Sequence, residues 1–212
     1  MSRFNPDCRL CPRLATHLQT VKKEYPDYHA RPVASFGVEQ PELLIVGLAP
    51  GMHGANATGR PFTGDFAGIL LYATLYRFGL ASKPVSEHKK DGLRLIKCRI
   101  TNAVKCLPPE NKPVGYEINT CNQYLASEIN ALDPGAVILA LGTVAHNATI
   151  KALGLKQKDH PFAHGRLHTL AGESWLLDSY HCSRYNTQTG RLTEKMFHEI
   201  FMKIHEILDI SN

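Results

Sequence analysis

The sequence predicts an α/β protein, a three-layer α/β/α sandwich around a four-stranded parallel sheet. Four short runs are apolar on consecutive residues, which is typical of strands buried on both faces. Longer helical stretches separate these runs, as crossover connections between parallel strands require. Glycine-rich and polar segments follow several of the strands, where α/β sheets bind their ligands. The 212 residues suffice for one well-formed core, so residues 1–212 are expected to form a single domain.

The elements alternate along the chain in the order that such a sheet requires. Apolar runs predict strands over residues 43–47, 100–104, 136–142 and 175–180. Helical patterns predict helices over residues 11–25, 66–78, 115–132, 143–153 and 193–208. Thr193 stands at the start of the last helix and is of a residue type that caps helices. We therefore expect functional residues to gather directly after the strands, at one edge of the sheet.

Composition and charge narrow the class of protein without deciding it. The net charge is +5 and the hydrophobic fraction 43%. A mild positive excess suits a polyanionic partner, but many basic proteins never bind nucleic acid. No apolar run approaches the roughly 20 residues that span a bilayer, and the first residues lack the apolar core of a signal peptide. We expect a cytoplasmic protein with no membrane partner.

Four of the six cysteines have the spacing of a metal site. Cys8 and Cys11 form a C-x2-C pair, and Cys106 and Cys121 follow far downstream. Thiolates from two distant segments can complete a tetrahedral zinc site or bind a [4Fe–4S] cluster, and the widely split second pair favours the cluster. Alternatively, the first pair consists of small buried residues at a helix start. Two cysteines have no partner at ligand spacing: Cys98, expected to be a packed or surface thiol, and Cys182.

A glycine-rich loop over residues 47–65 follows the first predicted strand. Glycines let backbone amides approach a ligand closely, so a phosphate or nucleotide loop is one interpretation. The loop contains neither the Gly-Lys-Ser/Thr of a P-loop nor the G-x-G-x-x-G of dinucleotide-binding proteins. Neither phosphate motif explains it.

The loop instead resembles the first motif of the uracil-DNA glycosylase superfamily, in the form Gly-Leu-Ala-Pro followed by Thr-Gly-Arg-Pro-Phe-Thr-Gly-Asp. Residues 101–113 resemble the segment that carries that family's base-reading asparagine and a cluster cysteine. Residues 181–192 resemble its histidine-bearing DNA-insertion loop and end in Thr-Gly-Arg-Leu, as in the family 5 branch. The resemblance extends from the first cysteine pair to the last helix.

This resemblance implies a monofunctional DNA glycosylase of base-excision repair. Such an enzyme flips a deaminated base out of the DNA stack and hydrolyses its N-glycosidic bond. The implied substrate is DNA containing uracil. The implied cofactor is a structural [4Fe–4S] cluster on the four cysteines named above, which ties the N-terminal helix to residues 106–121. Because one lesion needs one pocket, we expect a monomer.

The resemblance also assigns roles to single residues. Asn102 reads the flipped base through its amide, which offers a donor and an acceptor together, and Phe62 stacks on the base. His181 stabilises the negative charge that grows on the base oxygen O2 as the bond breaks. The alternatives are a turn asparagine, core packing of the phenylalanine and a structural histidine.

Asp65 is the acid left in the first motif. Many superfamily members carry an acid two residues past the first glycine, where this chain has Ala49, and a sister branch carries glutamate where it has Leu48. The resemblance therefore implies that Asp65 positions water or stabilises the sugar cation, although a helix N-cap also suits an aspartate before Phe66. The apolar residues predict a roomier base pocket, lined by Leu48, Ala49 and Gly51, that also accepts hypoxanthine or xanthine.

The last motif is expected to contact DNA. Its implied DNA-binding residues are Ser183 and Arg191 at phosphates, with Arg184, and Tyr185 as a wedge in the base stack. The usual pattern His-Pro-Ser is His-Cys-Ser here, and the loss of proline puts the rigidity of the loop in question.

Two other classes of protein compete with the glycosylase. One is a non-catalytic nucleic-acid-binding protein on the same scaffold, which would have no need for Asn102 and His181. The other is a zinc-stabilised nucleotide hydrolase, but the sequence shows no phosphate loop and no carboxylate cluster for a catalytic metal.

Overall fold

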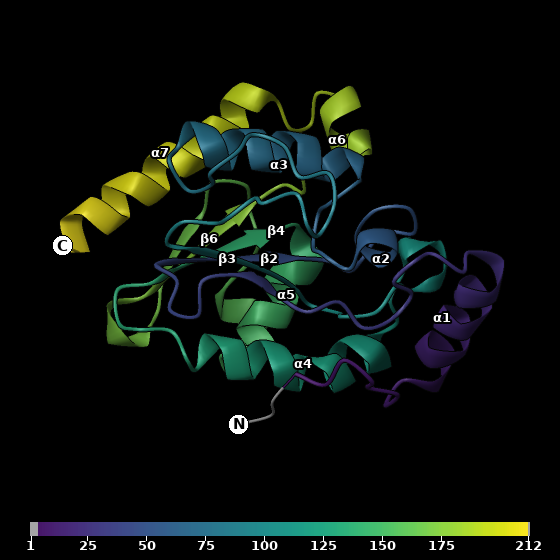
Figure 1. Ribbon diagram of the computed structural model, residues 1–212. Helices are drawn as coiled ribbons and strands as arrows, with labels where there is room; N and C mark the ends of the chain where they lie inside the picture. The colour runs from purple at the N-terminus through teal and green to yellow at the C-terminus, as the bar shows by residue number, and fades with distance from the viewer. Residues whose placement is uncertain (1–3, 212) are drawn as a thin grey trace.

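Six strands form one sheet in the order β1-β3-β2-β4-β6-β5 (Figure 1). The structure, a computed structural model, describes residues 4–211, and for 209–211 it describes the backbone alone. The four central strands are parallel, as predicted, and an antiparallel strand is added at each edge. The strands are β1 (Phe36–Gly37), β2 (Leu43–Gly47), β3 (Cys98–Asn102), β4 (Val137–Leu141), β5 (Leu167–Thr169) and β6 (Trp175–Ser179).

The two edge strands were not predicted because they are two and three residues long. Such short segments carry no readable alternation of apolar and polar residues. The predicted strand 100–104 in fact begins and ends two residues earlier. Arg99 pairs with Leu44 of β2, and its guanidinium group donates to the carbonyl oxygen of Val38. This charged residue interrupts the apolar pattern, so the sequence did not indicate that β3 begins before it.

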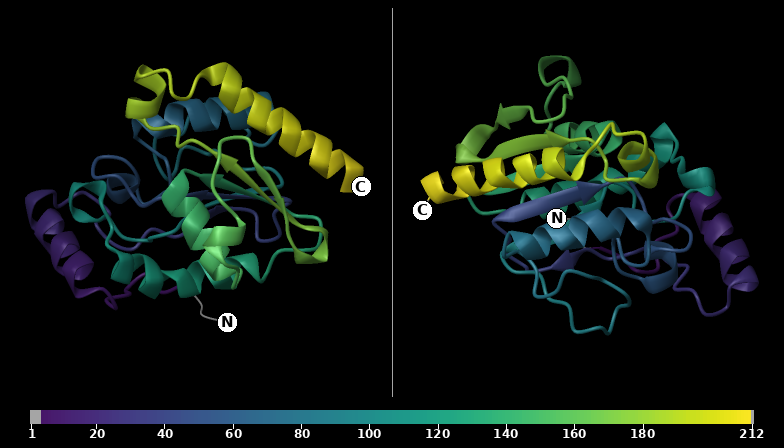
Figure 2. Two further views of the ribbon diagram at one scale, coloured as in Figure 1. Left: turned by 180° about the vertical axis from the view of Figure 1, so that it is seen from behind. Right: turned by 90° about the horizontal axis from the view of Figure 1, so that it is seen from above.

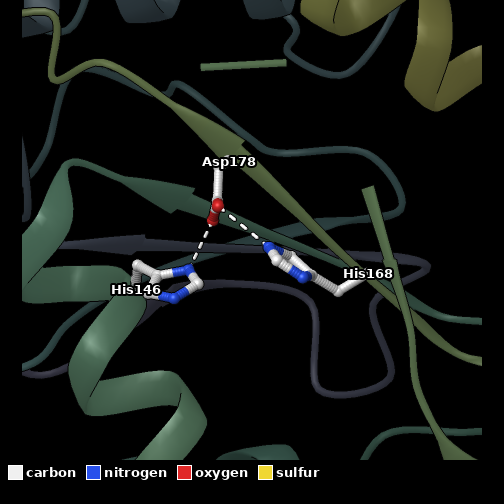
Figure 3. Close-up of side chains that lie close together, drawn as sticks. All are labelled: His146, His168 and Asp178. Atoms are coloured by element: carbon white, nitrogen blue, oxygen red, sulfur yellow. Dashed lines mark hydrogen bonds and ion pairs between the residues drawn. The ribbon is translucent and has the colours of Figure 1, made fainter. Parts of the chain in front are cut away.

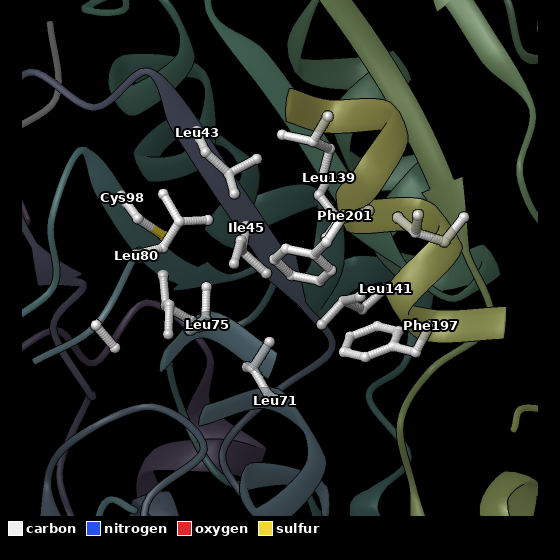
Figure 4. Packing of buried hydrophobic residues seen from close by; sticks show 14 of the residues in the cluster. Leu43, Ile45, Leu71, Leu75, Leu80, Cys98, Leu139, Leu141, Phe197 and Phe201 are labelled. Carbon is white, nitrogen blue, oxygen red and sulfur yellow. The ribbon is translucent and has the colours of Figure 1, made fainter. Parts of the chain in front are cut away.

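Helices cover both faces of the sheet and make the predicted three layers. α3 (Phe66–Arg77) and α7 (Glu194–Ser211) lie on one face, and α4 (Gly115–Ile129) and α5 (Thr143–Ala152) lie on the other (Figure 1). Strand β2 alternates between the two layers, which explains its unbroken apolar run. Leu43 and Ile45 pack toward α3 and α7 (Figure 4), whereas Leu44 and Val46 belong to the core on the opposite face.

The helix boundaries agree with the predicted ones within three residues. Thr193 caps α7 as predicted, because its Oγ1 accepts the N–H of Met196 at 3.2 Å. Helix α7 continues to Ser211, three residues past the predicted end. None of the helices within residues 4–211 is long and apolar enough to cross a membrane.

Three helices gather at one end of the sheet. α1 (Pro12–Glu24), the single-turn α2 (Ala55–Thr58) and the short α6 (Arg184–Gln188) all lie toward this end, with α6 well apart from α1 (Figures 1 and 2). Single turns of 3-10 helix occur at η1 (Pro109–Asn111), η2 (Gln157–Asp159) and η3 (Ala171–Glu173). Segments from both halves of the chain therefore meet beside the ends of the parallel strands.

Candidate active site

A pocket of about 460 Å³ opens where the central strands end. This size lies within the range of small-molecule sites, roughly 300–1,000 Å³. The segments after β2, β3, β4 and β6 all contribute to it, as the strand-end rule predicts. Nine of the residues predicted for the site line this pocket: Leu48, Ala49, Gly51, Phe62, Asp65, Asn102, His181, Ser183 and Arg191.

Asn102 is the last residue of β3 and is 3% exposed. It pairs with Gly47 of β2, and a Cβ atom on Gly47 would lie 2.4 Å from Asn102 Oδ1. Glycine is therefore required beside the amide. Oδ1 is buried and has no hydrogen-bond partner among the described residues. A buried carbonyl oxygen without a partner is costly, so it calls for a ligand or a water.

Phe62 and His181 stack in the same pocket, with ring centroids 5.8 Å apart. Phe62 has a φ of +54°, a left-handed conformation that is uncommon outside glycine and marks a position fixed by its surroundings. Burial lowers the pKa of His181 to about 4, so its imidazole is neutral near pH 7. His181 Nδ1 is also buried without a partner among the described residues. The pocket therefore contains two unsatisfied polar atoms beside an aromatic ring.

Arg60 anchors the loop that carries Phe62. Its guanidinium group is 3% exposed and lies 2.9 Å from the carboxylate of Asp91, and it also donates to Ser86 Oγ at 3.1 Å. Ser86 Oγ in turn lies 2.6 Å from the Oγ1 atom of Thr63, the residue that follows Phe62 in the chain. Arg60 thus holds the loop around Phe62 in place, a role that the sequence did not indicate.

Asp65 stands at the start of α3 and lines the pocket. Its Oδ1 accepts the N–H of Gly68 at 2.9 Å, so the predicted N-cap is present. A Cβ atom on Gly51 would lie 3.7 Å from the other oxygen, Oδ2, which therefore faces the glycine loop. Burial raises the pKa of Asp65 above its ordinary value, against the two backbone hydrogen bonds that lower it.

The loop after β6 is ordered without the usual proline. Ser183 caps α6, with its Oγ accepting the N–H of Asn186 at 3.4 Å, and Asn186 Nδ2 donates to the carbonyl oxygen of His181 at 2.8 Å. Cys182 is fully buried in the core, and burial raises the pKa of its thiol. These contacts hold the loop at the position where the usual proline is missing.

The predicted DNA-binding side chains lie on and beside α6. The Arg191 guanidinium stacks 4.7 Å from the ring of Tyr180 at the pocket, and the Arg184 guanidinium lies 5.2 Å from the ring of Phe66. Tyr185 is 70% exposed. Arg184 and Tyr185 lie outside the pocket lining, on the surface next to it.

Several pocket residues were missed by the sequence prediction. Phe162 lines the pocket from a loop without a motif, and Asn111 lines it from η1, within the motif segment 101–113 but with no role assigned to it. Asn111 has a φ of +57°, a conformation that asparagine tolerates better than most residues, but one sequence does not reveal it. Thr143 and Val144 line it from the start of α5, whose first turn has no side-chain cap. The sequence could have indicated these two residues, because α5 directly follows the central strand β4 and ligands bind beyond strand ends.

The four predicted metal ligands lie around one small cavity between α1, the segment after β3 and α4. It is lined by Cys8, Cys11, Cys106 and Cys121. Burial and the neighbouring cysteines raise the pKa of Cys11 to about 11. The backbone N–H of Lys105 donates to Cys121 Sγ at 3.3 Å. These sulfurs are not among the ligand atoms that gather within 4.8 Å of one another in the described residues.

A second group of titratable side chains lies behind the pocket. Asp178 of β6 lies between His146 and His168, and all three are buried (Figure 3). The carboxylate oxygens lie 2.7 Å from His146 Nδ1 and 3.0 Å from His168 Nε2. No motif pointed to this group, because its members come from α5, β5 and β6 at unrelated spacings.

The fold and the pocket together define an α/β protein with a cavity at the ends of its parallel strands, where unpartnered polar atoms lie beside an aromatic ring. Comparison with known families gives the same assignment, since the model of the uracil DNA glycosylase superfamily matches residues 34–205. The chain is 47% identical over 201 residues to a type-5 uracil-DNA glycosylase of Thermus thermophilus, covering 92% of this chain and 91% of that protein.

Two further relatives agree. A type-5 uracil-DNA glycosylase of Mycobacterium tuberculosis is 42% identical over 96% of this chain and 79% of its own length. One of Pyrobaculum aerophilum is 40% identical over 93% of this chain and 87% of its own length. This chain belongs to the uracil-DNA glycosylase superfamily, and the resemblance seen in its motifs is confirmed.

Proposed function

We propose that this protein is a DNA glycosylase of base-excision repair that hydrolyses the N-glycosidic bond of uracil in DNA. One observation carries the proposal: Asn102 Oδ1 and His181 Nδ1 are buried, lack partners among the described residues and line the same pocket as Phe62. A flipped base supplies hydrogen-bonding groups for the amide and a flat face for the ring.

In this proposal each polar group has its own task. The Asn102 amide binds the hydrogen-bonding edge of uracil. The neutral imidazole of His181 donates a hydrogen bond to O2, where negative charge grows as the departing base takes the bonding electron pair. Asp65 receives a proton from the water that adds to C1′. Its raised pKa suits a group that accepts a proton near neutral pH.

We propose that DNA lies across the surface formed by α6 and the pocket rim. Ser183 and Arg191 contact phosphates there with Arg184, and Tyr185 enters the base stack that the flipped nucleotide leaves. The exposure of Tyr185 and the hydrogen-bonded order of the loop support this arrangement.

We propose a [4Fe–4S] cluster on Cys8, Cys11, Cys106 and Cys121. The four thiols line one cavity, and the second pair is widely split in the sequence, which fits a cluster with four separate iron corners. When bound, the cluster supplies no chemistry for hydrolysis. It ties α1 to the segment after β3, which is Asn102's own strand.

The range of substrates extends beyond uracil in this proposal. Leu48 and Ala49 line the pocket with apolar side chains where related branches carry acids, so the larger deaminated purines hypoxanthine and xanthine also fit. Excision of uracil with both purines left intact under the same conditions would contradict this part. The pocket forms within one chain, which supports a single-domain, monomeric enzyme, and we also propose a cytoplasmic location.

The test is incubation with an oligonucleotide containing one uracil, followed by alkali cleavage at the resulting abasic site. The wild type is expected to yield the cleaved strand. Asn102→Ala is expected to lose activity while still binding DNA. Wild-type binding without cleavage would instead indicate a non-catalytic DNA-binding protein.

A further inference from the structure

The buried group of Asp178, His146 and His168 has no task in the proposed reaction (Figure 3). His146 and Asp178 are fully buried and His168 is 8% exposed. His146 Nε2 lies 2.8 Å from the carbonyl oxygen of His160, an acceptor only, and His146 Nδ1 lies 2.7 Å from Asp178 Oδ1. In this structure the three side chains therefore form one buried hydrogen-bond network.

This network fastens the segment 160–166 to the sheet. The carbonyl oxygen of His160 is held by His146, and the N–H of Ala163 points to Asp178 Oδ2 at 3.4 Å. The backbone of Asp178 also accepts from the N–H of Gly165 at 2.8 Å and donates to the carbonyl oxygen of Arg166 at 3.0 Å. Asp178 thus contacts the segment through both its carboxylate and its backbone.

The segment carries two side chains that build the pocket wall. Phe162 lines the pocket, and its ring packs edge-on against His146, with centroids 5.6 Å apart. His164 stacks on Tyr180 at 4.9 Å, and its Nδ1 accepts the N–H of Tyr180 at 3.1 Å. Tyr180 also lines the pocket and carries the stacked Arg191.

We propose that Phe162 is a specificity-determining residue of the base pocket and that Asp178 is the positioning residue that holds it there. Besides the His181 imidazole, Phe162 and Tyr180 are the aromatic rings that the second half of the chain adds to the described pocket lining. Phe162 limits the room at one wall of the pocket, and Asp178 fixes the position of Phe162 through His146 and the 160–166 backbone. This inference rests on the proposed base pocket.

The prediction is tested with Phe162→Ala, Asp178→Asn and the double variant, assayed on uracil and on thymine opposite guanine. Phe162→Ala is expected to raise the thymine-to-uracil ratio of kcat/KM by about tenfold or more, the effect of one methyl group in an apolar pocket. Asp178→Asn is expected to raise it in the same direction, and to lower kcat/KM for uracil by roughly tenfold to a hundredfold through misplacement.

Because Asp178 acts through Phe162, the double variant should change the ratio no further than Phe162→Ala alone. Multiplicative effects of the two substitutions, or an unchanged ratio in Asp178→Asn, would overturn the inference. A downfield imidazole proton in the NMR spectrum of the wild type, lost in Asp178→Asn, is the expected signature of the network.

Ile138→Ala is the matched control, since it removes a buried core side chain of β4 outside the pocket. It is expected to lower Tm without changing the ratio. If Asp178→Asn does not fold, His168→Phe removes one of the carboxylate's two imidazole partners and must raise the ratio. Asn102→Ala distinguishes a failure of the proposed base pocket from a failure of this inference. If Asn102→Ala keeps full activity, the proposed base pocket is wrong. If it is inactive while Asp178→Asn leaves the thymine-to-uracil ratio unchanged, only the positioning role of Asp178 is refuted.

Discussion

Asp65 uses its two carboxylate oxygens differently: Oδ1 caps α3 through the N–H of Gly68 at 2.9 Å, while Oδ2 faces the glycine loop of the pocket. The residue thus combines a structural contact with a candidate catalytic one. Asparagine caps helices about as well as aspartate does, but it cannot accept a proton from water, so substitution can separate the two roles.

We expect Asp65→Asn to keep the thermal stability of the wild type and to lose excision activity by about a hundredfold or more. Asp65→Ala should lose the same activity and also about 1 kcal/mol of stability, the usual cost of a missing N-cap. Thermal unfolding and single-turnover cleavage check both. Full activity of Asp65→Asn would show that the carboxylate serves the helix only.

Gly47→Ala is expected to disable the pocket. The new methyl group would lie 2.4 Å from Asn102 Oδ1 and 2.7 Å from the ring of Phe62, so both side chains must move. Such overpacking costs about 1–3 kcal/mol of stability. Gly115→Ala is the control, because nothing lies within 4 Å of the added methyl group. Equal cleavage rates for the two variants would contradict the proposed role of Asn102.

Stability should fall as the pH drops from about 6.5 toward 4. Burial lowers the pKa of His181 to about 4 from an ordinary 6.5, and burial also lowers the pKa values of His164 and His29. Below pH 6.5 the unfolded chain therefore binds more protons than the folded one at these sites. The raised pKa of Asp65 acts in the opposite sense and returns part of the loss.

Urea unfolding midpoints at pH 7.5, 6 and 5 measure this dependence. His181→Gln should show a shallower decline than the wild type, because it lacks the buried imidazole whose pKa falls to about 4. A midpoint that stays constant from pH 7.5 to 5 would contradict the assignment of buried, neutral histidines.

Cys121→Ser is expected to remove the proposed cluster. Wild-type protein prepared without air should be brown and absorb at about 400 nm, and the variant should be pale and contain less iron. Cys98→Ser is the matched control, because Cys98 is fully buried yet does not line the cavity of the four cysteines. A colourless wild type with zinc bound would refute the cluster.

Tyr185→Ala should weaken excision from duplex DNA much more than from single-stranded DNA. The side chain is 70% exposed, so its removal leaves the fold intact. A wedge matters only where a neighbouring base stack must be opened. Measuring kcat/KM on both forms of one sequence checks this, and an equal loss on both would assign Tyr185 to backbone contact instead.

Local patterns in the sequence determined most of the fold. The central strands β2 and β4 are buried on both faces, so their apolar runs predicted them. Thr193, a residue type that caps helices, indicated the start of α7. The edge strand at Phe36 was not readable, because its pairing with Ile100 depends on a partner more than sixty positions away. Pairings of that kind are tertiary and leave no local signal.

The same division holds for the pocket. The predicted pocket residues stand in long motifs directly after strands, and the structure places them around one cavity. Phe162 and the buried network of Asp178 had no such signal. Their side chains meet only because α5, β5 and β6 are brought together by the sheet, and the 160–166 loop has no regular spacing of its own.

The capped turn at Ser183 and the bond from Asn186 to the His181 carbonyl mean that the loop after β6 is already folded before DNA arrives. A loop that must order itself on binding loses conformational entropy at that moment, and this loss weakens affinity. In this protein the loop loses most of that conformational entropy when the chain folds. In the proposed complex, DNA would dock against a protein surface that is already formed, and the flipped nucleotide would be the main part that rearranges.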